Sequence, residues 1–195
     1  KQGPSSVYGK TKLKCEKLVQ TFCAKNNLNY GILRYFNVAG ASSSGKIGQI
    51  SKGDQLFKNL SVEIKKKKPV FKIYGTNYKT KDGTCVRDYI HVSDISDIHY
   101  KILLKIDKKN ISKILNCGYG KGISVNDVIK EFKKHANNNL KIVKFPKRKG
   151  DMVKVISDSS KLEKFINWKP RYNSLKKIVQ TSLKWENKLK LHEKL

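Results

Sequence analysis

Leu33-Arg34-Tyr35-Phe36-Asn37-Val38-Ala39-Gly40-Ala41 is the stretch of sequence that decides the fold. It begins inside a largely apolar run, residues 30–36, which predicts a strand buried on both faces of a parallel sheet. The Gly-, Ser- and Ala-rich segment 37–54 that follows predicts a long loop, and a loop of this length in a compact domain is usually functional. We therefore expect a buried strand that ends at a functional loop.

Helical and strand patterns alternate on both sides of this stretch. The sequence predicts helices over residues 7–26 and 55–68, from residue 93 to 106, from residue 124 onwards, and near 159–167 and 174–190. It predicts further strands over residues 70–74, 86–92, 114–117 and 140–145. Strands that alternate with helices indicate an α/β architecture with a largely parallel sheet.

The composition is that of a globular protein. Of the 195 residues, 38% are hydrophobic and 9% are aromatic, which is enough for one sizeable domain with a core. No apolar run approaches the roughly 18 residues of a membrane span, and no signal-peptide pattern follows the first residues. The four cysteines, Cys15, Cys23, Cys85 and Cys117, lack metal-ligand spacing. We therefore expect a cytoplasmic protein with reduced thiols and no metal site.

The formal net charge of +28 invites a nucleic-acid function. Only four of the 43 basic residues are arginines, however, although the planar arginine fork is favoured for phosphate and base recognition. The lysines are also spread over nearly every segment. A basic module that binds nucleic acid or acidic polymers remains the alternative from another class, and it would show salt-dependent binding to arbitrary DNA.

Tyr8 and Lys12 are four residues apart at the start of a predicted helix, so their side chains project from one face. A tyrosine hydroxyl is a poor base at neutral pH, but a nearby ammonium group stabilises its phenolate. This spacing recurs by chance in a lysine-rich chain, so the pair needs support from the rest of the sequence.

That support comes from several motifs in a fixed order. The segment with Tyr8 and Lys12 is followed by the opening stretch, then by Ile73-Tyr74-Gly75, Asp82-Gly83-Thr84 and Val86-Arg87-Asp88-Tyr89-Ile90-His91-Val92. Over residues 5–185 the chain resembles the extended short-chain dehydrogenase/reductase family, and within it the NAD-dependent UDP-glucose 4-epimerases. The resemblance implies reversible inversion at carbon 4 of UDP-glucose or UDP-galactose, through a transient 4-keto sugar and tightly bound NAD.

The resemblance also implies the domain organisation. Residues 1–40 and 86–118 would complete the C-terminal part of a Rossmann-like parallel sheet, and residues 41–85 and 119–195 would mainly bind substrate. The chain begins at Lys1 and its only methionine is Met152, so we expect a fragment that lacks the NAD-binding half and the catalytic Ser or Thr. Such a fragment would have an open sheet edge, would not hold NAD alone and would be inactive. A homodimer is expected for the whole protein.

Catalysis and cofactor binding are assigned by the resemblance to four residues. Tyr8 would be the acid/base that removes the proton from the hydroxyl at carbon 4. Lys12 would stabilise the Tyr8 phenolate and hold the nicotinamide ribose. Tyr35 and Phe36 would lie on the cofactor side of the pocket.

Substrate binding is assigned by the resemblance to residues farther along the chain. Arg87 and Arg148 would clamp the diphosphate, Asn37 would hydrogen-bond near it, and Asp151 would accept from a ribose hydroxyl. The full predicted set is Asn37, Gln55, Leu56, Lys72, Tyr74, Arg87, Arg148, Asp151 and Val155, with Lys72 beside the uracil and Tyr74 stacked on it. We expect Asp88 and His91 to be structural.

Two positions depart from the family pattern. Asp54-Gln55-Leu56 stands where relatives carry Asn or His before Leu; Gln55 can donate a hydrogen bond, but Asp54 would repel a diphosphate. Val155 stands where strict glucose/galactose epimerases carry a bulky tyrosine, which would leave room for an N-acetyl group. The alternatives within the fold are a UDP-N-acetylglucosamine 4-epimerase and a sugar-nucleotide dehydratase or decarboxylase.

Overall fold

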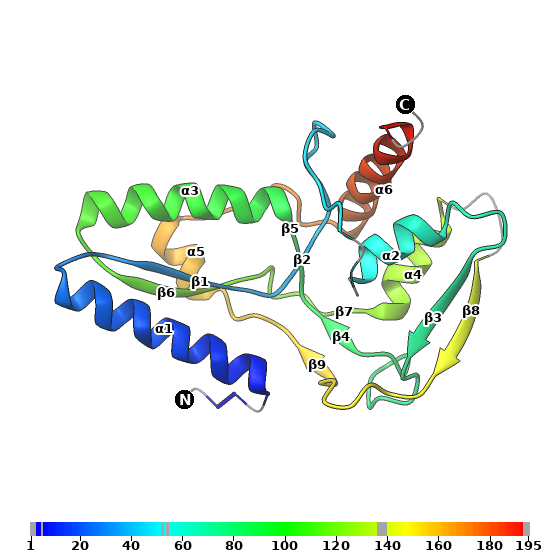
Figure 1. The fold of residues 1–195 in the computed structure, drawn as a ribbon, viewed down its shortest axis with the longest axis horizontal. Coiled ribbons are helices and arrows are strands. Elements are labelled where there is room, and N and C mark those ends of the chain that lie inside the picture. Colours follow the sequence, from blue (N-terminus) through cyan, green and yellow to red (C-terminus); the bar gives the residue numbers. More distant parts are fainter. Residues whose placement is uncertain (1–2, 5, 52, 54, 136–139, 193–195) are drawn as a thin grey trace.

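The computed structural model describes residues 3–4, 6–51, 53, 55–135 and 140–192 (Figure 1). Its helices are α1 (Val7–Lys25), α2 (Leu56–Glu63), α3 (Val92–Lys109), α4 (Val125–Lys133), α5 (Ser160–Ile166) and α6 (Leu175–His192). Its strands are β1 (Gly31–Tyr35), β2 (Asn37–Ala39), β3 (Val70–Tyr74), β4 (Val86–Arg87), β5 (Tyr89–His91), β6 (Lys113–Cys117), β7 (Ile123–Ser124), β8 (Lys141–Phe145) and β9 (Lys154–Val155). Four pairings, β1–β6, β2–β5, β3–β8 and β4–β9, are parallel, and β4–β7 is antiparallel. The predicted α/β class with largely parallel pairing is confirmed.

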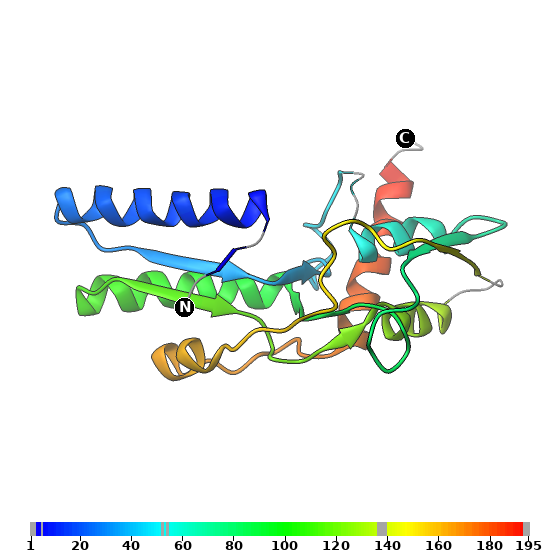
Figure 2. The same cartoon turned by 90° about the horizontal axis from the view of Figure 1, so that it is seen from below.

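The opening stretch contains the end of β1 and all of β2, and β1 is covered by helices on both faces. α1 lies on one side of the β1–β6 pair, and α3 and α5 lie on the other (Figures 1 and 2). Successive side chains of a strand point to opposite faces. Arg34 accordingly reaches Glu16 of α1, whereas the Tyr35 hydroxyl bonds to His99 Nε2 of α3 at 2.6 Å. Within the described residues β6 is the only strand paired with β1, in agreement with the predicted open edge.

The buried hydrophobic residues form two clusters. The first joins α2, α4 and α6 and includes Leu60, Phe132 and Val179, as well as Phe57. The second joins α3, β6 and α5, where Leu162 and Trp168 pack. Those two residues come from the segment 119–195, which was expected mainly to bind substrate. The exact division of the chain into two parts therefore stays a prediction.

α2 is shorter than the sequence predicts. It ends at Glu63, whereas the periodicity predicted a helix to residue 68. The difference lies in the run of four lysines over residues 65–68 before Pro69. Like charges three or four residues apart destabilise a helix, and the residue before a proline avoids the helical conformation.

The predicted strand 86–92 is two short strands that belong to different sheets. β4 pairs with β9 and β7, whereas β5 pairs with β2. Asp88 stands between them: its N–H donates to the Val155 carbonyl at 3.1 Å, and its carbonyl accepts from Asn37 N–H at 3.0 Å. The chain thus crosses from one sheet to the next at Asp88, and β2, which lies in the predicted loop 37–54, is held by this crossing.

No helix in the described ranges is long and apolar enough to cross a membrane. All four cysteines are free.

Candidate functional site

The start of α1 places Tyr8 and Lys12 side by side. Ser6 caps the helix by accepting a hydrogen bond from Gly9 N–H at 3.0 Å. Tyr8 therefore lies in the first turn, where it is 72% exposed. Lys12 Nζ lies 5.5 Å from the centroid of the Tyr8 ring. The pair forms one polar, accessible face at the N-terminal end of α1.

An ion pair holds this helix on β1. Two guanidinium nitrogens of Arg34 donate to the two carboxylate oxygens of Glu16, at 2.7 and 2.5 Å. Hydrogen bonding to Glu16 raises the pKa of Arg34, so the guanidinium remains charged. A bidentate pair of this kind constrains orientation as well as distance, and it sets how α1 lies on β1, which ends at Tyr35.

A cavity of 1410 Å³ brings the predicted substrate-binding residues together. Eight of the nine line it: Asn37, Gln55, Leu56, Lys72, Tyr74, Arg87, Arg148 and Asp151. They come from β2, the start of α2, β3, β4 and the loop after β8. The ninth, Val155, is half-buried in β9 directly opposite Arg87. Tyr8, Lys12, Tyr35 and Phe36 lie outside the residues that line the cavity.

The cavity wall is rich in positive charge. Its basic side chains are Lys58, Lys66, Lys68, Lys72, Arg87 and Arg148, and its acidic ones are Glu63, Asp151 and Glu186. The first turn of α2 also faces the cavity through Gln55 and Leu56, and the Gln55 side chain makes no capping hydrogen bond to it. Unpaired N–H groups at a helix start favour anions. The wall is thus suited to a negatively charged ligand.

The two cavity arginines have protein partners in the structure. The Arg87 guanidinium donates to the Val86 carbonyl at 2.9 Å and to Asp151 Oδ1 at 3.2 Å. The Arg148 guanidinium lies 4.2 Å from the centroid of the Tyr74 ring. Arg148 therefore covers a face of the aromatic ring that was expected to stack on the uracil.

Cys85 and Tyr89 line the cavity without having been predicted from the sequence. Burial raises the pKa of both groups, so the thiol and the phenol stay neutral. Tyr89 lies within the same motif as Arg87, and this proximity was the only feature of the sequence that could have placed Tyr89 at the cavity. Neither residue adds charge to the wall.

Lys58 and Glu186 form a buried ion pair in the cavity wall, with Nζ 2.6 Å from Oε2. Their side chains are only 7% and 8% exposed. The sequence carried no signal for this pair, because Lys58 looks like one more solvated lysine of α2 and its partner is 128 residues away.

The first departure from the family pattern, Asp54-Gln55-Leu56, lies only partly within the described residues. Gln55 is described, and its side-chain oxygen accepts a hydrogen bond from the Gln49 amide. Asp54 lies outside the described residues, so its expected repulsion of a diphosphate stays a prediction.

His91 is structural, as predicted. Its Nδ1 accepts from Ser93 N–H at 3.1 Å and caps α3, and its Nε2 bonds to Thr181 Oγ1 at 3.0 Å. The ring stacks on Tyr172 at 4.4 Å between centroids. Burial lowers the pKa of His91 to about 4, so the imidazole is neutral at pH 7.

Asp88 is structural as well and joins three separate segments. It is fully buried, and its carboxylate accepts from the N–H groups of Tyr119 (3.0 Å), Gly120 (2.9 Å) and Ser157 (3.2 Å). The Ser157 hydroxyl adds a fourth bond at 2.5 Å. These bonds hold the turn after β6 and the segment after β9 next to β4, which carries Arg87.

We expect Asp88→Ala to lower the free energy of unfolding by about 3 kcal/mol, because it leaves several buried donors without an acceptor. For a chain of this size the melting temperature should fall by roughly 10 °C. Thermal denaturation followed by circular dichroism measures this. The exposed Asp107→Ala is the control and should stay within about 0.5 kcal/mol of the wild type; equal effects of the two changes would contradict the structural role of Asp88.

Comparisons with known proteins show which family the chain belongs to. The model of the NAD-dependent epimerase/dehydratase family matches residues 1–118. A UDP-glucose 4-epimerase of Azospirillum brasilense is 36% identical over 187 residues, which are 95% of this chain and 54% of that protein. The chain thus spans about half the length of this curated relative.

Two solved structures extend the comparison. UDP-glucose 4-epimerase from Stenotrophomonas maltophila, with bound NAD and formylated UDP-arabinopyranose, superposes with a TM-score of 0.88 at 32% identity, covering 95% of this chain and 56% of that one. The UDP-Glc/GlcNAc 4-epimerase of Campylobacter jejuni has a TM-score of 0.76 at 38% identity, covering 95% and 57%. With a family model that matches more than half of its residues, the chain belongs to the NAD-dependent epimerase/dehydratase family.

Proposed function

We propose that the chain is the substrate-binding part, together with the catalytic Tyr8–Lys12 pair, of an NAD-dependent UDP-sugar 4-epimerase. The reaction is the interconversion of UDP-glucose and UDP-galactose. One observation carries the proposal: residues from five separate segments, predicted to bind a UDP-sugar, line one cavity with a basic wall. The names of the relatives with 32–38% identity support the same reaction.

Each part of a UDP-sugar has a counterpart in the wall. Arg87, Arg148 and the first turn of α2 would bind the diphosphate, which carries the negative charge. To reach a phosphate, Arg148 would leave the Tyr74 ring, and that ring would then be free to stack on the uracil. Asp151 would accept from a ribose hydroxyl, and Asn37 would hydrogen-bond near the diphosphate.

The residues of this chain fit one part of NAD. Tyr8 and Lys12 are exposed on α1, and β1 has an unpaired edge within the described residues, as a larger dinucleotide-binding sheet would require. A glycine-rich G-x-x-G-x-x-G turn for the pyrophosphate does not occur in the sequence. We therefore propose that this chain contributes the nicotinamide-ribose side, and that another segment of the enzyme contributes the rest.

Tyr8 and Lys12 would carry the proton transfers. Bound NAD supplies a reversible hydride acceptor for carbon 4. The Tyr8 phenolate, which Lys12 stabilises, takes the proton from the hydroxyl at carbon 4 and becomes the neutral phenol, and Lys12 also holds the ribose hydroxyls. The 4-keto sugar then turns about the diphosphate, and Tyr8 returns the proton to the oxygen of the inverted centre. Tyr35 and Phe36 are proposed to shape the cofactor side of this site.

The proposal extends to assembly and location. Leu18, Val19 and Phe22 are 69%, 42% and 61% exposed on α1, which supports a homodimer that buries part of this helix. Sedimentation of the whole enzyme would measure its oligomeric state. The free cysteines support a reducing, cytoplasmic location.

The reaction is tested by nuclear magnetic resonance on a protein that joins this chain to an NAD-binding half. We expect UDP-galactose to be converted to UDP-glucose until the two reach equilibrium. Release of water from the sugar would instead indicate a dehydratase, and release of carbon dioxide from a UDP-uronic acid a decarboxylase. Salt-dependent DNA binding without any turnover would favour the basic binding module.

We further propose that the enzyme accepts UDP-N-acetylglucosamine, because the small Val155 would leave room for the N-acetyl group. The 38% identity to the UDP-Glc/GlcNAc 4-epimerase of Campylobacter jejuni supports this. Val155→Tyr is expected to reduce turnover of the N-acetyl sugar about tenfold or more and to leave UDP-galactose turnover within about twofold, a discrimination of 1–2 kcal/mol by pocket size. Normal UDP-galactose turnover without any N-acetyl turnover in the unaltered enzyme would contradict it.

A further inference from the structure

Two consecutive residues of α6 reach into the cavity wall. Trp185 and Glu186 both line the cavity, and α6 lies beside α2 (Figure 1). Trp185 Nε1 donates to the Gln49 carbonyl at 2.9 Å. The Glu186 carboxylate accepts from Lys58 Nζ at 2.6 Å. One turn of α6 therefore holds the chain at two points, residue 49 and residue 58.

The segment between these two points carries the start of α2. Gln55 and Leu56, both proposed to bind near the diphosphate, lie within it. The Gln49 side-chain amide donates to the Gln55 side chain. The hydrogen bonds thus run from Trp185 through Gln49 to Gln55, and the Gln55 side chain makes no capping bond to its own helix. The position of the first turn of α2 depends on contacts from α6.

Both contacts are tight. A Cβ added at Gly48 would lie 2.5 Å from ring atoms of Trp185, so only glycine lets the backbone pack this closely on the indole. The Lys58–Glu186 pair is almost fully buried, and removing one partner of such a pair leaves an uncompensated charge. Neither contact can loosen without a cost in free energy.

We propose that Trp185 and Glu186 are positioning residues for the diphosphate end of the cavity, because they hold Gln49 and Lys58, one before and one after Gln55 and Leu56. This inference rests on the proposed function. Because it concerns only the diphosphate, it predicts a ligand dependence that a general loss of stability would not produce: binding of UDP should weaken while binding of uridine should not.

Trp185→Phe removes the indole N–H but keeps an aromatic ring against Gly48. We expect the affinity of the 195-residue chain for UDP to fall about fivefold, the effect of one hydrogen bond, with uridine affinity unchanged. Titrations followed by ligand nuclear magnetic resonance measure both. Gln180→Ala, an exposed change on the same helix, is the matched control and should alter neither affinity.

Glu186→Gln and hydrogen exchange give independent readouts. Glu186→Gln should also weaken the binding of UDP more than the binding of uridine. In Trp185→Phe without ligand, backbone amides around residues 42–51 should exchange faster than in Gln180→Ala. Equal losses of affinity for UDP and uridine would overturn this inference but not the proposed function. So would unchanged rates of amide hydrogen exchange together with an unchanged affinity for UDP. If the wild-type chain binds no UDP, the proposed function fails and the inference falls with it.

Discussion

Replacing Tyr8 with phenylalanine is expected to lower the epimerisation rate about a thousandfold, which is within the range for the loss of a positioned general base. The change removes one hydroxyl from an exposed ring whose neighbour is Lys12. Because Tyr8 lies outside the cavity lining, UDP affinity should stay within about twofold of the wild type. A kinetic assay of UDP-galactose turnover, on a protein that joins this chain to an NAD-binding half, measures the first effect, and a UDP titration measures the second.

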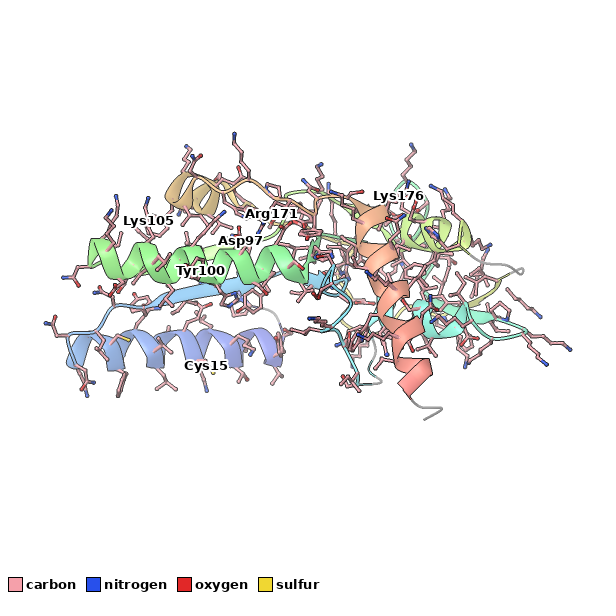
Figure 3. The ribbon with its side chains drawn as sticks, turned by 90° about the horizontal axis from the view of Figure 1, so that it is seen from above. Cys15, Asp97, Tyr100, Lys105, Arg171 and Lys176 are labelled. Atoms are coloured by element: carbon pink, nitrogen blue, oxygen red, sulfur yellow. The ribbon has the colours of Figure 1, made fainter. Side chains whose placement is uncertain are left out.

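Tyr100→Phe provides the matched control, since Tyr100 is also a largely exposed tyrosine but lies on α3 (Figure 3). It should leave the turnover rate unchanged. Retention of more than about a tenth of the wild-type rate by Tyr8→Phe would contradict the acid/base role. A parallel loss of UDP affinity would mean that the change had disturbed the cavity as a whole.

Arg87→Ala is expected to weaken UDP binding about a hundredfold. Charge-assisted hydrogen bonds to a phosphate contribute roughly 1.5–3 kcal/mol each, and about 2.7 kcal/mol corresponds to this factor. In the wild type the Arg87 guanidinium lies 3.2 Å from Asp151 Oδ1. The change removes this cationic partner from Asp151, whose carboxylate would then repel the diphosphate. Calorimetric titration of the 195-residue chain with UDP measures the loss.

Arg171→Ala is the control for removing an arginine of this chain. Arg171 pairs with Asp97 at 3.4 Å, its side chain is 70% exposed, and it is not among the residues that line the cavity (Figure 3). It should leave UDP affinity unchanged, because exposed ion pairs contribute little. Arg87→Lys, which keeps the charge but loses the planar fork, should lie between wild type and Arg87→Ala. Equal affinities of Arg87→Ala and wild type would remove Arg87 from the proposed site.

Local patterns predicted elements wherever a single segment decides its own structure. The sequence predicted the helix over residues 7–26, the strand over 70–74 and the helix from residue 124 onwards, and the structure contains all three. Their boundaries depend on neighbours within a few residues. The predicted end of α2 was wrong, because a run of like charges destabilises the helix that the apolar spacing favours over the same residues.

Crossings between sheets could not be predicted in this way. The residues 86–92 look like one strand, but the buried Asp88 collects donors from segments about 30 and 70 residues away, and the chain changes partner there. A carboxylate is buried only when enough donors converge on it. Which donors converge depends on the packing of the whole chain, and no local pattern contains that information.

The sequence by itself determined the family motifs and the α/β class, because motif order and periodicity are properties of the chain alone. The resemblance that these motifs carry implied the set of residues proposed to bind a UDP-sugar. Only the tertiary structure decided that eight of those residues share one cavity while Tyr8 and Lys12 lie outside its lining. It alone revealed that Lys58 is paired with Glu186 and that Trp185 holds Gln49. Contacts over such separations exist only after the hydrophobic clusters have brought α2 and α6 together, since it is this packing that removes their polar groups from water.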